Sequence, residues 1–153
     1  MQQNEKIISF MDEVRTKQMK NFLEKRLECN MDDVPFDTYK QQCDCLIHIL
    51  KNNLGVRTDI ELINKIVQTP FNIGYEDSIY IGLVRSFLFI KGYPIGLHFT
   101  IDKDLYRAIN DFKYKYGIKT PVFKNVFMSF EVLVKLIDKR YTPFDNDNII
   151  QRR

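Results

Sequence analysis

The 153-residue chain is 44% hydrophobic and 28% charged, a composition that excludes intrinsic disorder as its expected state. Its length suits one compact domain, or two subdomains packed side by side. The formal net charge of +3 is a small excess of cations, which is compatible with an anionic partner but does not predict one.

The N-terminal sequence MQQNEKIISF contains no long apolar run and no small-residue cleavage site. We therefore expect neither a secretory signal peptide nor a transmembrane helix, and no membrane partner. The expected location is cytoplasmic as synthesised, and the cell wall would be reached only by release or by export through another route.

An amphipathic helix is predicted from about Asn4 to Glu28, where apolar residues recur at helical spacing among Lys, Arg and Glu. The apolar stripe lapses near residues 16–18, so an interruption is expected there. The helix either packs on the body of the protein or binds a partner or a second copy, and the sequence leaves both open. Pro35 lacks an amide hydrogen and disfavours helix before it, so we assign residues 1–36 to this helix and its linker.

Three cysteines, Cys29, Cys43 and Cys45, give an odd count without the framework of a disulfide-stapled domain. Cys43 and Cys45 with His48 close behind suggest zinc, because thiolates and imidazole are good zinc ligands. On a helix, however, residues two apart are rotated by about 200° and do not converge on one ion. We therefore predict reduced thiols and no metal site.

Five further helices are predicted, each bounded by a polar N-cap, a glycine or a proline. They cover about residues 38–53, 59–68, 78–91, 102–116 and 129–139. The candidate N-caps are Thr58 or Asp59, Asp77 or Ser78, Asp102 or Thr100, and Ser129, and the candidate C-cap glycines are Gly55, Gly92 and Gly117. Residues 121–127 are expected as loop or as short strands paired with the loop around Phe99, and residues 141–153 as a polar tail. The fold class is therefore mainly α.

Two segments repeat one pattern, IHILKNNLGV from Ile47 and IGLVRSFLFIKGY from Ile81. In each, an apolar residue is followed at three and seven positions by two more, and then by a turn that contains glycine. A recurring unit of helix, glycine and loop is typical of repeat architectures. We assign a short diverged unit to residues 37–73 and a longer three-helix unit to residues 74–140.

The longer unit has apolar residues, a Gly-Tyr pair, an Ala-Ile-x-x-Phe run and a Gly-Ile pair in one order. The positions are Ile81, Val84, Arg85, Leu88, Gly92, Tyr93, Ala108, Ile109, Phe112, Lys113, Gly117 and Ile118. In this order they resemble the peptidoglycan-binding-domain family found beside bacterial and phage cell-wall hydrolases. That family reads Val-x-x-Leu-Gln-x-x-Leu, Gly-Tyr, an Asp-Gly turn, Thr-x-x-Ala-Val-x-x-Phe-Gln and Gly-Leu. The short unit is similar at Ile47, Leu50, Lys51, Leu54, Gly55, Val56 and Asp59, so the resemblance covers about residues 44–137.

The resemblance implies a three-helix scaffold and a non-catalytic module that binds peptidoglycan, in which two linked units gain avidity. Lys51, Arg85 and Lys113 replace the family's glutamines, and Ile60 replaces the glycine of the Asp-Gly turn. Because the retained positions are mainly those of a helical core, the match favours the scaffold more than glycan binding.

A wall-binding surface needs aromatic faces that stack on sugars and donors for the polar groups of the polymer. We predict such a ligand-binding surface at Tyr93, His98, Phe99, Lys113, Tyr114 and Tyr116. No catalytic residue, cofactor or enzymatic activity is predicted, because His98 has no recognisable acid–base partner in the sequence. The chain also lacks a phosphate-cradling glycine loop, an HExxH zinc helix and a nucleophile elbow.

A second hypothesis keeps the scaffold but assigns it to protein interaction, as a small helical adaptor without glycan binding. The altered turns, the N-terminal amphipathic helix and the 12 Phe and 8 Tyr residues support it. A third, nucleic-acid binding, rests on the alternating lysines and aromatics of DFKYKYGIKTPVFK, but the acidic runs MDD and FDNDN offset that charge. The oligomeric state is not predicted.

Overall fold

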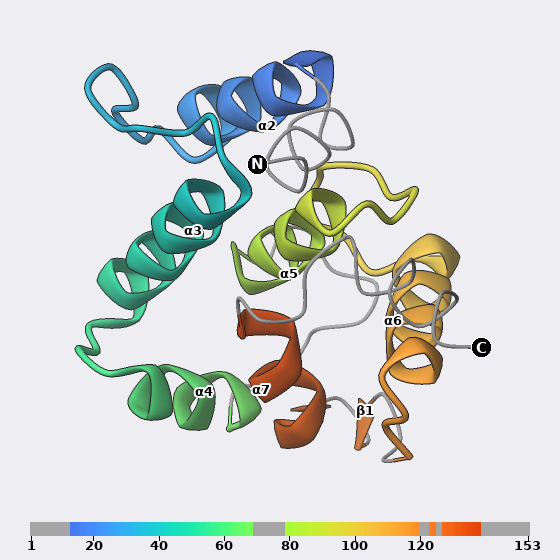
Figure 1. The fold of residues 1–153 in the computed structure, drawn as a ribbon. Helices are drawn as coiled ribbons and strands as arrows, with labels where there is room; N and C mark the ends of the chain where they lie inside the picture. The colour runs from blue at the N-terminus through green and yellow to red at the C-terminus, as the bar shows by residue number, and fades with distance from the viewer. Residues whose placement is uncertain (1–12, 69–78, 120–122, 125–126, 139–153) are drawn as a thin grey trace.

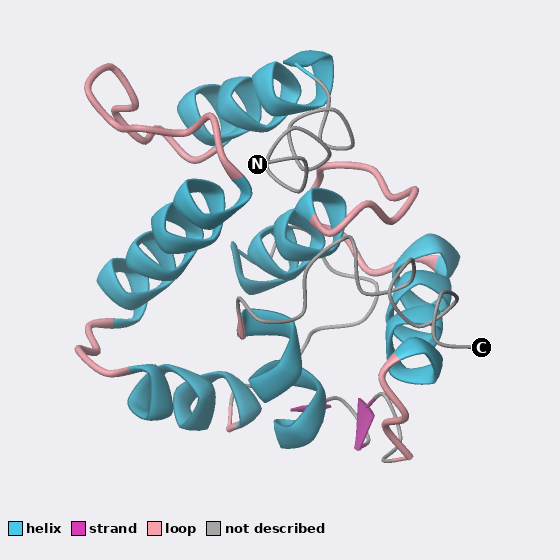
Figure 2. Ribbon diagram, viewed as in Figure 1, coloured by secondary structure: helices cyan, strands magenta, loops and turns pink. Residues whose placement is uncertain are grey.

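A computed structural model of the chain describes residues 13–68, 79–119, 123–124 and 127–138 (Figure 1). These residues form helices and one short hairpin, so the fold is mainly α as predicted (Figure 2). The elements are α2 (Glu13–Arg26), α3 (Tyr39–Leu54), α4 (Asp59–Val67), α5 (Ile79–Ile90), α6 (Lys103–Lys115), β1 (Phe123–Lys124), β2 (Phe127–Met128) and α7 (Phe130–Ile137). Among the described residues, no helix has the length and apolar character needed to cross a bilayer.

Helix α5 lies at the centre of the arrangement, and α3, α6 and α7 contact it (Figure 1). Every residue of α5 from Ile81 to Ile90 is buried. A helix with apolar residues on nearly every side is expected to be enclosed by others, and only Arg85 and Ser86 are polar in this stretch. One hydrophobic cluster contains buried residues of all the described helices, so the segments predicted as residues 37–73 and 74–140 share this core.

Local sequence signals define where α3, α4 and α6 begin. The side chain of Thr38 accepts a hydrogen bond from the Gln41 amide, and the Gln41 side chain accepts one from the Thr38 amide, which forms a capping box. Thr58 and Glu61 form the same box at α4, so Thr58 rather than Asp59 is the N-cap. At α6 the N-cap is Asp102, whose carboxylate accepts a hydrogen bond of 3.0 Å from the Leu105 amide.

Helices α3, α5 and α6 end in the same way, at the glycines that the sequence predicts as C-caps. The backbone φ angle is 68° at Gly55, 95° at Gly92 and 67° at Gly117, all in the left-handed region. In each case the amide of the residue after the glycine donates back into the helix: Val56 N to Lys51 O, Tyr93 N to Leu88 O and Ile118 N to Lys113 O. These are Schellman endings, which satisfy carbonyl groups left unpaired at a helix C-terminus.

The repeated pattern describes these endings better than it describes the packing. Gly55 follows Leu54 directly, whereas Gly92 comes four residues after Leu88. When the two segments are aligned at their glycines, their apolar residues are therefore out of register. Helix α3 is also amphipathic while α5 is buried all round. The two segments therefore share the same type of C-terminal cap but pack differently in the fold.

Three expectations about element boundaries are corrected. Helix α2 runs without a break through residues 16–18, and the partly buried Thr16 accepts a hydrogen bond of 3.4 Å from Gln42 of α3. β1 pairs antiparallel with β2, not with the loop around Phe99. Helix α7 begins after Ser129 as expected but ends at Ile137, and the Ser129 side chain makes no capping hydrogen bond.

The described part of α2 packs on the body of the protein. It buries Met19, Phe22 and Leu23, and the Arg15 guanidinium lies 3.8 Å from the centroid of the Phe89 ring in α5. The Arg15 side chain also donates a hydrogen bond of 2.6 Å to the Phe89 carbonyl. The predicted helix start near Asn4, the caps Asp77 and Ser78, and the polar tail lie outside the described residues.

Candidate functional site

Three of the predicted ligand-binding aromatics belong to the core or its edge. Phe99 is 8% exposed and packs against Phe22 of α2, with the ring centroids 5.4 Å apart. Tyr93 and Tyr116 both contact the buried Phe112 ring edge-on, at centroid distances of 6.2 and 4.8 Å. Edge-to-face contacts of this kind are typical of aromatic packing inside proteins. These rings therefore hold α2, α5 and α6 together and do not form an open stacking platform.

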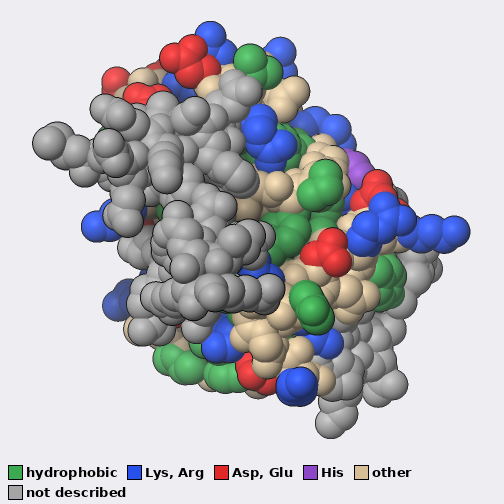
Figure 3. All heavy atoms as spheres, turned by 45° about the vertical axis from the view of Figure 1, so that its right-hand side comes forward, with side chains coloured by type: hydrophobic (Ala, Val, Ile, Leu, Met, Phe, Trp, Pro, Cys, Tyr) green, Lys and Arg blue, Asp and Glu red, His purple; other side chains and the backbone are tan. Residues whose placement is uncertain are grey.

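The other three predicted residues, Lys113, Tyr114 and His98, are not buried in the core. Tyr114 is 90% exposed, and Lys113 is half-buried on the same helix. His98 lies in the loop between α5 and α6. The side of the molecule that carries α6 comes forward in Figure 3, where hydrophobic side chains are interspersed with charged ones.

The loop around His98 is organised by a completely buried arginine that sequence analysis read only as a substitution in a family motif. Arg85 of α5 donates hydrogen bonds to the carbonyls of Thr100 (2.9 Å) and Gly96 (3.1 Å) and to the Asp102 carboxylate (2.5 Å). Burial lowers the pKa of Arg85, while the adjacent Asp102 opposes that shift. The sequence signal that could have indicated this pair is an arginine within an otherwise apolar helix, Arg85, followed by a candidate N-cap aspartate, Asp102.

His98 is engaged within the same cluster. Its Nδ1 accepts hydrogen bonds from the Thr100 amide (3.3 Å) and pairs with the Thr100 hydroxyl (2.8 Å), and its Nε2 lies 3.4 Å from the Asp102 carboxylate. Burial, followed by the charge of Arg85, lowers the pKa of His98. The imidazole thus fastens the turn that leads into α6, which gives it a structural role.

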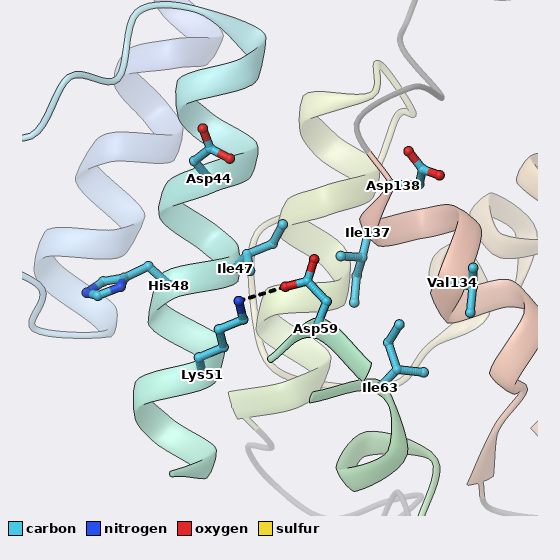
Figure 4. Close-up of a pocket in the computed structure, with 9 residues that line it drawn as sticks. All are labelled: Asp44, Ile47, His48, Lys51, Asp59, Ile63, Val134, Ile137 and Asp138. Atoms are coloured by element: carbon cyan, nitrogen blue, oxygen red, sulfur yellow. Dashed lines mark ion pairs between the residues drawn. The ribbon is translucent and has the colours of Figure 1, made fainter. Parts of the chain in front are cut away.

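A groove between α3, α4 and α7 has the features of a binding site (Figure 4). Its volume is about 670 Å³, and none of the six predicted ligand-binding residues lines it. The apolar part consists of Ile47, Ile63, Val134 and Ile137, and the polar part of Asp44, His48, Lys51, Asp59 and Asp138. Helices from three separate parts of the chain therefore build one concave surface.

Carboxylates outnumber ammonium groups in this groove. Three aspartates and one lysine line it, and the Lys51 ammonium lies 2.6 Å from an Asp59 carboxylate oxygen. In Figure 4, the side chains of Lys51 and Asp59 point toward one another between α3 and α4, and Asp44 and Asp138 lie on opposite sides, above Ile47 and Ile137. In the described part of the chain, the groove therefore presents an aliphatic floor below a rim with more carboxylates than ammonium groups.

A second groove of about 580 Å³ lies on the other side of α3 and shares Asp44 and His48 with the first. In Figure 4, the His48 ring points away from Asp59 and Ile63. The second groove is lined by Cys29, Asn30, Met31, Val34, Pro35, Gln41, Asp44, Cys45, His48, Ile49 and Asn52.

The two neighbouring cysteines of α3 do not point to one place. Cys43 is completely buried in the core, whereas Cys45 is half-buried and lines the second groove. This matches the 200° rotation expected for helix residues two apart. Within residues 13–68, 79–119, 123–124 and 127–138, no three side chains of His, Cys, Asp or Glu form a group that could hold a metal ion.

No protein-family model matches the sequence, and no curated protein or solved structure matches it either. The peptidoglycan-binding resemblance therefore stays a prediction.

Proposed function

We propose that the protein is a non-catalytic binding module that takes a short basic, amphipathic segment of a partner protein into the groove between α3, α4 and α7. The observation that supports this most directly is the aliphatic floor under an acidic rim, built by three helices. This corresponds to the adaptor hypothesis.

Helical grooves with apolar floors accept amphipathic helices through anchors spaced three or four residues apart. Ile63 and Ile137 are 6% and 5% exposed and pack in the hydrophobic core, so the floor of the groove is formed before any partner binds. Ile60 is 55% exposed and lies three residues before Ile63 on α4, which makes them neighbours on the helix surface. The apolar surface offered to a partner thus continues from the floor onto the outer face of α4.

The charge of the rim defines the kind of partner. Its described side chains include three carboxylates and one ammonium group, so Lys or Arg side chains of a partner should gain more electrostatic energy there than Asp or Glu side chains. Interactions at an exposed rim act mainly on the association rate and weaken with salt. Selectivity for a basic segment should therefore be strongest at low ionic strength.

Cell-wall binding has less support from the geometry. Phe99 is buried, and the rings of Tyr93 and Tyr116 pack against Phe112, so fewer aromatic faces are open to a sugar than the sequence predicts. Binding to peptidoglycan stays the alternative proposal, and it would have to use exposed residues such as Tyr114.

The test is selection of random 16-residue peptides on the full-length protein, followed by affinity measurement of the enriched peptides. We expect basic, amphipathic sequences, and we expect Asp44→Lys to weaken them about tenfold at low salt and less at high salt. Asp111→Lys is the matched control, because Asp111 is exposed on α6 and does not line the groove.

Acidic enriched peptides, or equal losses in Asp44→Lys and Asp111→Lys, would overturn the proposal. Purified cell-wall sacculi test the alternative in the same assay. Retention on sacculi that Asp44→Lys leaves unchanged, together with failure to select peptides, would favour wall binding.

A further inference from the structure

A cluster of soft sulfur ligands lies in the second groove, and the proposed protein-binding function does not use it. Cys29 and Met31 come from the loop between α2 and α3, and Cys45 comes from the second turn of α3. The Cys45 Sγ and Met31 Sδ atoms are 3.9 Å apart. We propose that Cys29, Met31 and Cys45 form a three-sulfur site that binds one monovalent copper ion.

The sulfur separation fits two ligands of one metal ion. A metal–sulfur bond is about 2.3 Å long in zinc–thiolate sites, and at a trigonal angle two such sulfurs lie about 4.0 Å apart. The observed 3.9 Å between Cys45 and Met31 needs little rearrangement to meet this geometry. The pair is therefore preorganised for an ion between them.

The backbone of the loop brings Cys29 into the same groove. Glu28 has a φ angle of 53°, in the left-handed region, although it is not glycine. The Cys29 amide donates a hydrogen bond of 3.1 Å to Leu23 O, and the Val34 amide donates one of 3.3 Å to Met31 O. Because Cys29 and Met31 lie outside any helix, the rotation that separates Cys43 from Cys45 does not separate them.

Cys29 and Cys45 face one groove, although they come from the loop and from α3. Both side chains line it together with Met31, whose sulfur touches that of Cys45. Burial raises the pKa of Cys29.

The ligand set selects copper over zinc. Zinc sites in proteins use thiolate, imidazole and carboxylate ligands, whereas thioethers together with thiolates favour monovalent copper. On binding, the two S–H bonds break, two protons pass to solvent, and Cu–S bonds form with copper still monovalent. Because an ordinary thiol has a pKa of about 8.5, affinity should rise by about 100-fold per pH unit around neutrality, a tenfold change for each proton released.

The experiment is titration of the reduced full-length protein with Cu(I) under ascorbate and without oxygen, in competition with the chromophoric chelator bathocuproine disulfonate. We expect one ion per chain. Cys45→Ser and Cys29→Ser should weaken binding at least 100-fold and Met31→Leu about tenfold, in line with the loss of one ligand from a three-ligand site.

Cys43→Ala is the matched control, because Cys43 is the third thiol of the chain but is buried on the other face of α3. Equal losses in Cys43→Ala and Cys45→Ser, or unchanged affinity in Met31→Leu, would overturn the site. X-ray absorption of the wild-type complex gives a readout without any substitution. Three sulfurs at about 2.3 Å support the assignment, and oxygen or nitrogen neighbours in their place refute it.

Discussion

Arg85 and Asp102 form an ion pair in which the guanidinium is completely buried and the carboxylate is 38% exposed. The arginine comes from the central helix α5, and the aspartate is the N-cap of α6. One carboxylate therefore neutralises a buried charge, accepts the capping hydrogen bond of a helix and fixes the approach of α6 to the core.

Replacing Asp102 by asparagine should separate these roles. Asparagine is as good an N-cap as aspartate, so Asp102→Asn keeps the cap and removes only the charge. Because it leaves the buried Arg85 without its counter-ion, we expect the free energy of unfolding to fall by about 3 kcal/mol in urea denaturation. Asp102→Ala should cost about 1 kcal/mol more, for the lost cap.

Asp104→Asn is the control for this comparison. Asp104 also lies in the first turn of α6, but its pair with Arg107 is long, at 3.7 Å, and both side chains are exposed. The expected change is below about 0.5 kcal/mol, as for other exposed ion pairs. Equal effects of Asp102→Asn and Asp104→Asn would show that the buried pair contributes nothing special.

The same pair predicts a pH dependence. Desolvation opposes ionisation of Asp102, but the Leu105 amide and the Arg85 guanidinium outweigh it and hold the pKa of Asp102 below its usual value. A lowered pKa contributes stability that is complete above the unfolded-state value of about 3.9 and is lost as pH falls through the folded-state value. The stability difference between wild type and Asp102→Asn, measured in urea, should therefore shrink as pH falls through the acidic range in which Asp102 titrates. Burial and the charge of Arg85 lower the pKa of His98 and the Asp102 charge opposes that shift, so His98 adds a separate change where the imidazole titrates.

Gly82→Ala tests whether Phe99 is a core residue. A Cβ on Gly82 would lie 2.6 Å from Phe99 Cε1, far inside normal contact distance. Alanine raises helix propensity by about 1 kcal/mol, but overpacking in a buried helix costs about 1–3 kcal/mol. We expect net destabilisation, read as a lower thermal midpoint.

The double variant Gly82→Ala/Phe99→Leu supplies the control. If the clash with the ring is the cause, the two substitutions should be non-additive, and the double variant should be more stable than the sum of the single effects by 1 kcal/mol or more. Additive effects would contradict the contact.

Tyr39→Phe probes a buried ammonium at the junction of α3, α5 and α7. Lys91 is 3% exposed, and its Nζ donates to the Tyr39 hydroxyl at 2.7 Å and to the Asp138 carbonyl at 3.4 Å. Removing one acceptor from a buried charged donor should cost about 1–3 kcal/mol in urea denaturation. Tyr114→Phe, at a tyrosine that is 90% exposed, should change nothing measurable.

Only those features of the site that depend on residues within one or two helical turns of one another could be predicted from the sequence. The failure of Cys43 and Cys45 to converge follows from helix geometry alone, and local sequence narrowed the N-cap of α6 to Asp102 or Thr100. The groove between α3, α4 and α7 needs residues more than 70 positions apart, such as Ile63 and Ile137, and no local pattern links them. The approach of Met31 to Cys45 likewise depends on how a loop folds back over α3.

By itself, the sequence determined the helical class, most helix boundaries and the three glycine endings, because capping and helical periodicity depend on neighbours along the chain. Tertiary structure alone decided that α5 is the central helix, that Phe99 is buried against Gly82 and Phe22, and that Arg85 holds the loop before α6. The physical reason is that burial and ion pairing depend on contacts between segments that are far apart in the sequence, and local patterns do not specify these contacts. The presence of an aromatic residue in the sequence therefore does not reveal whether its ring faces a ligand or the core.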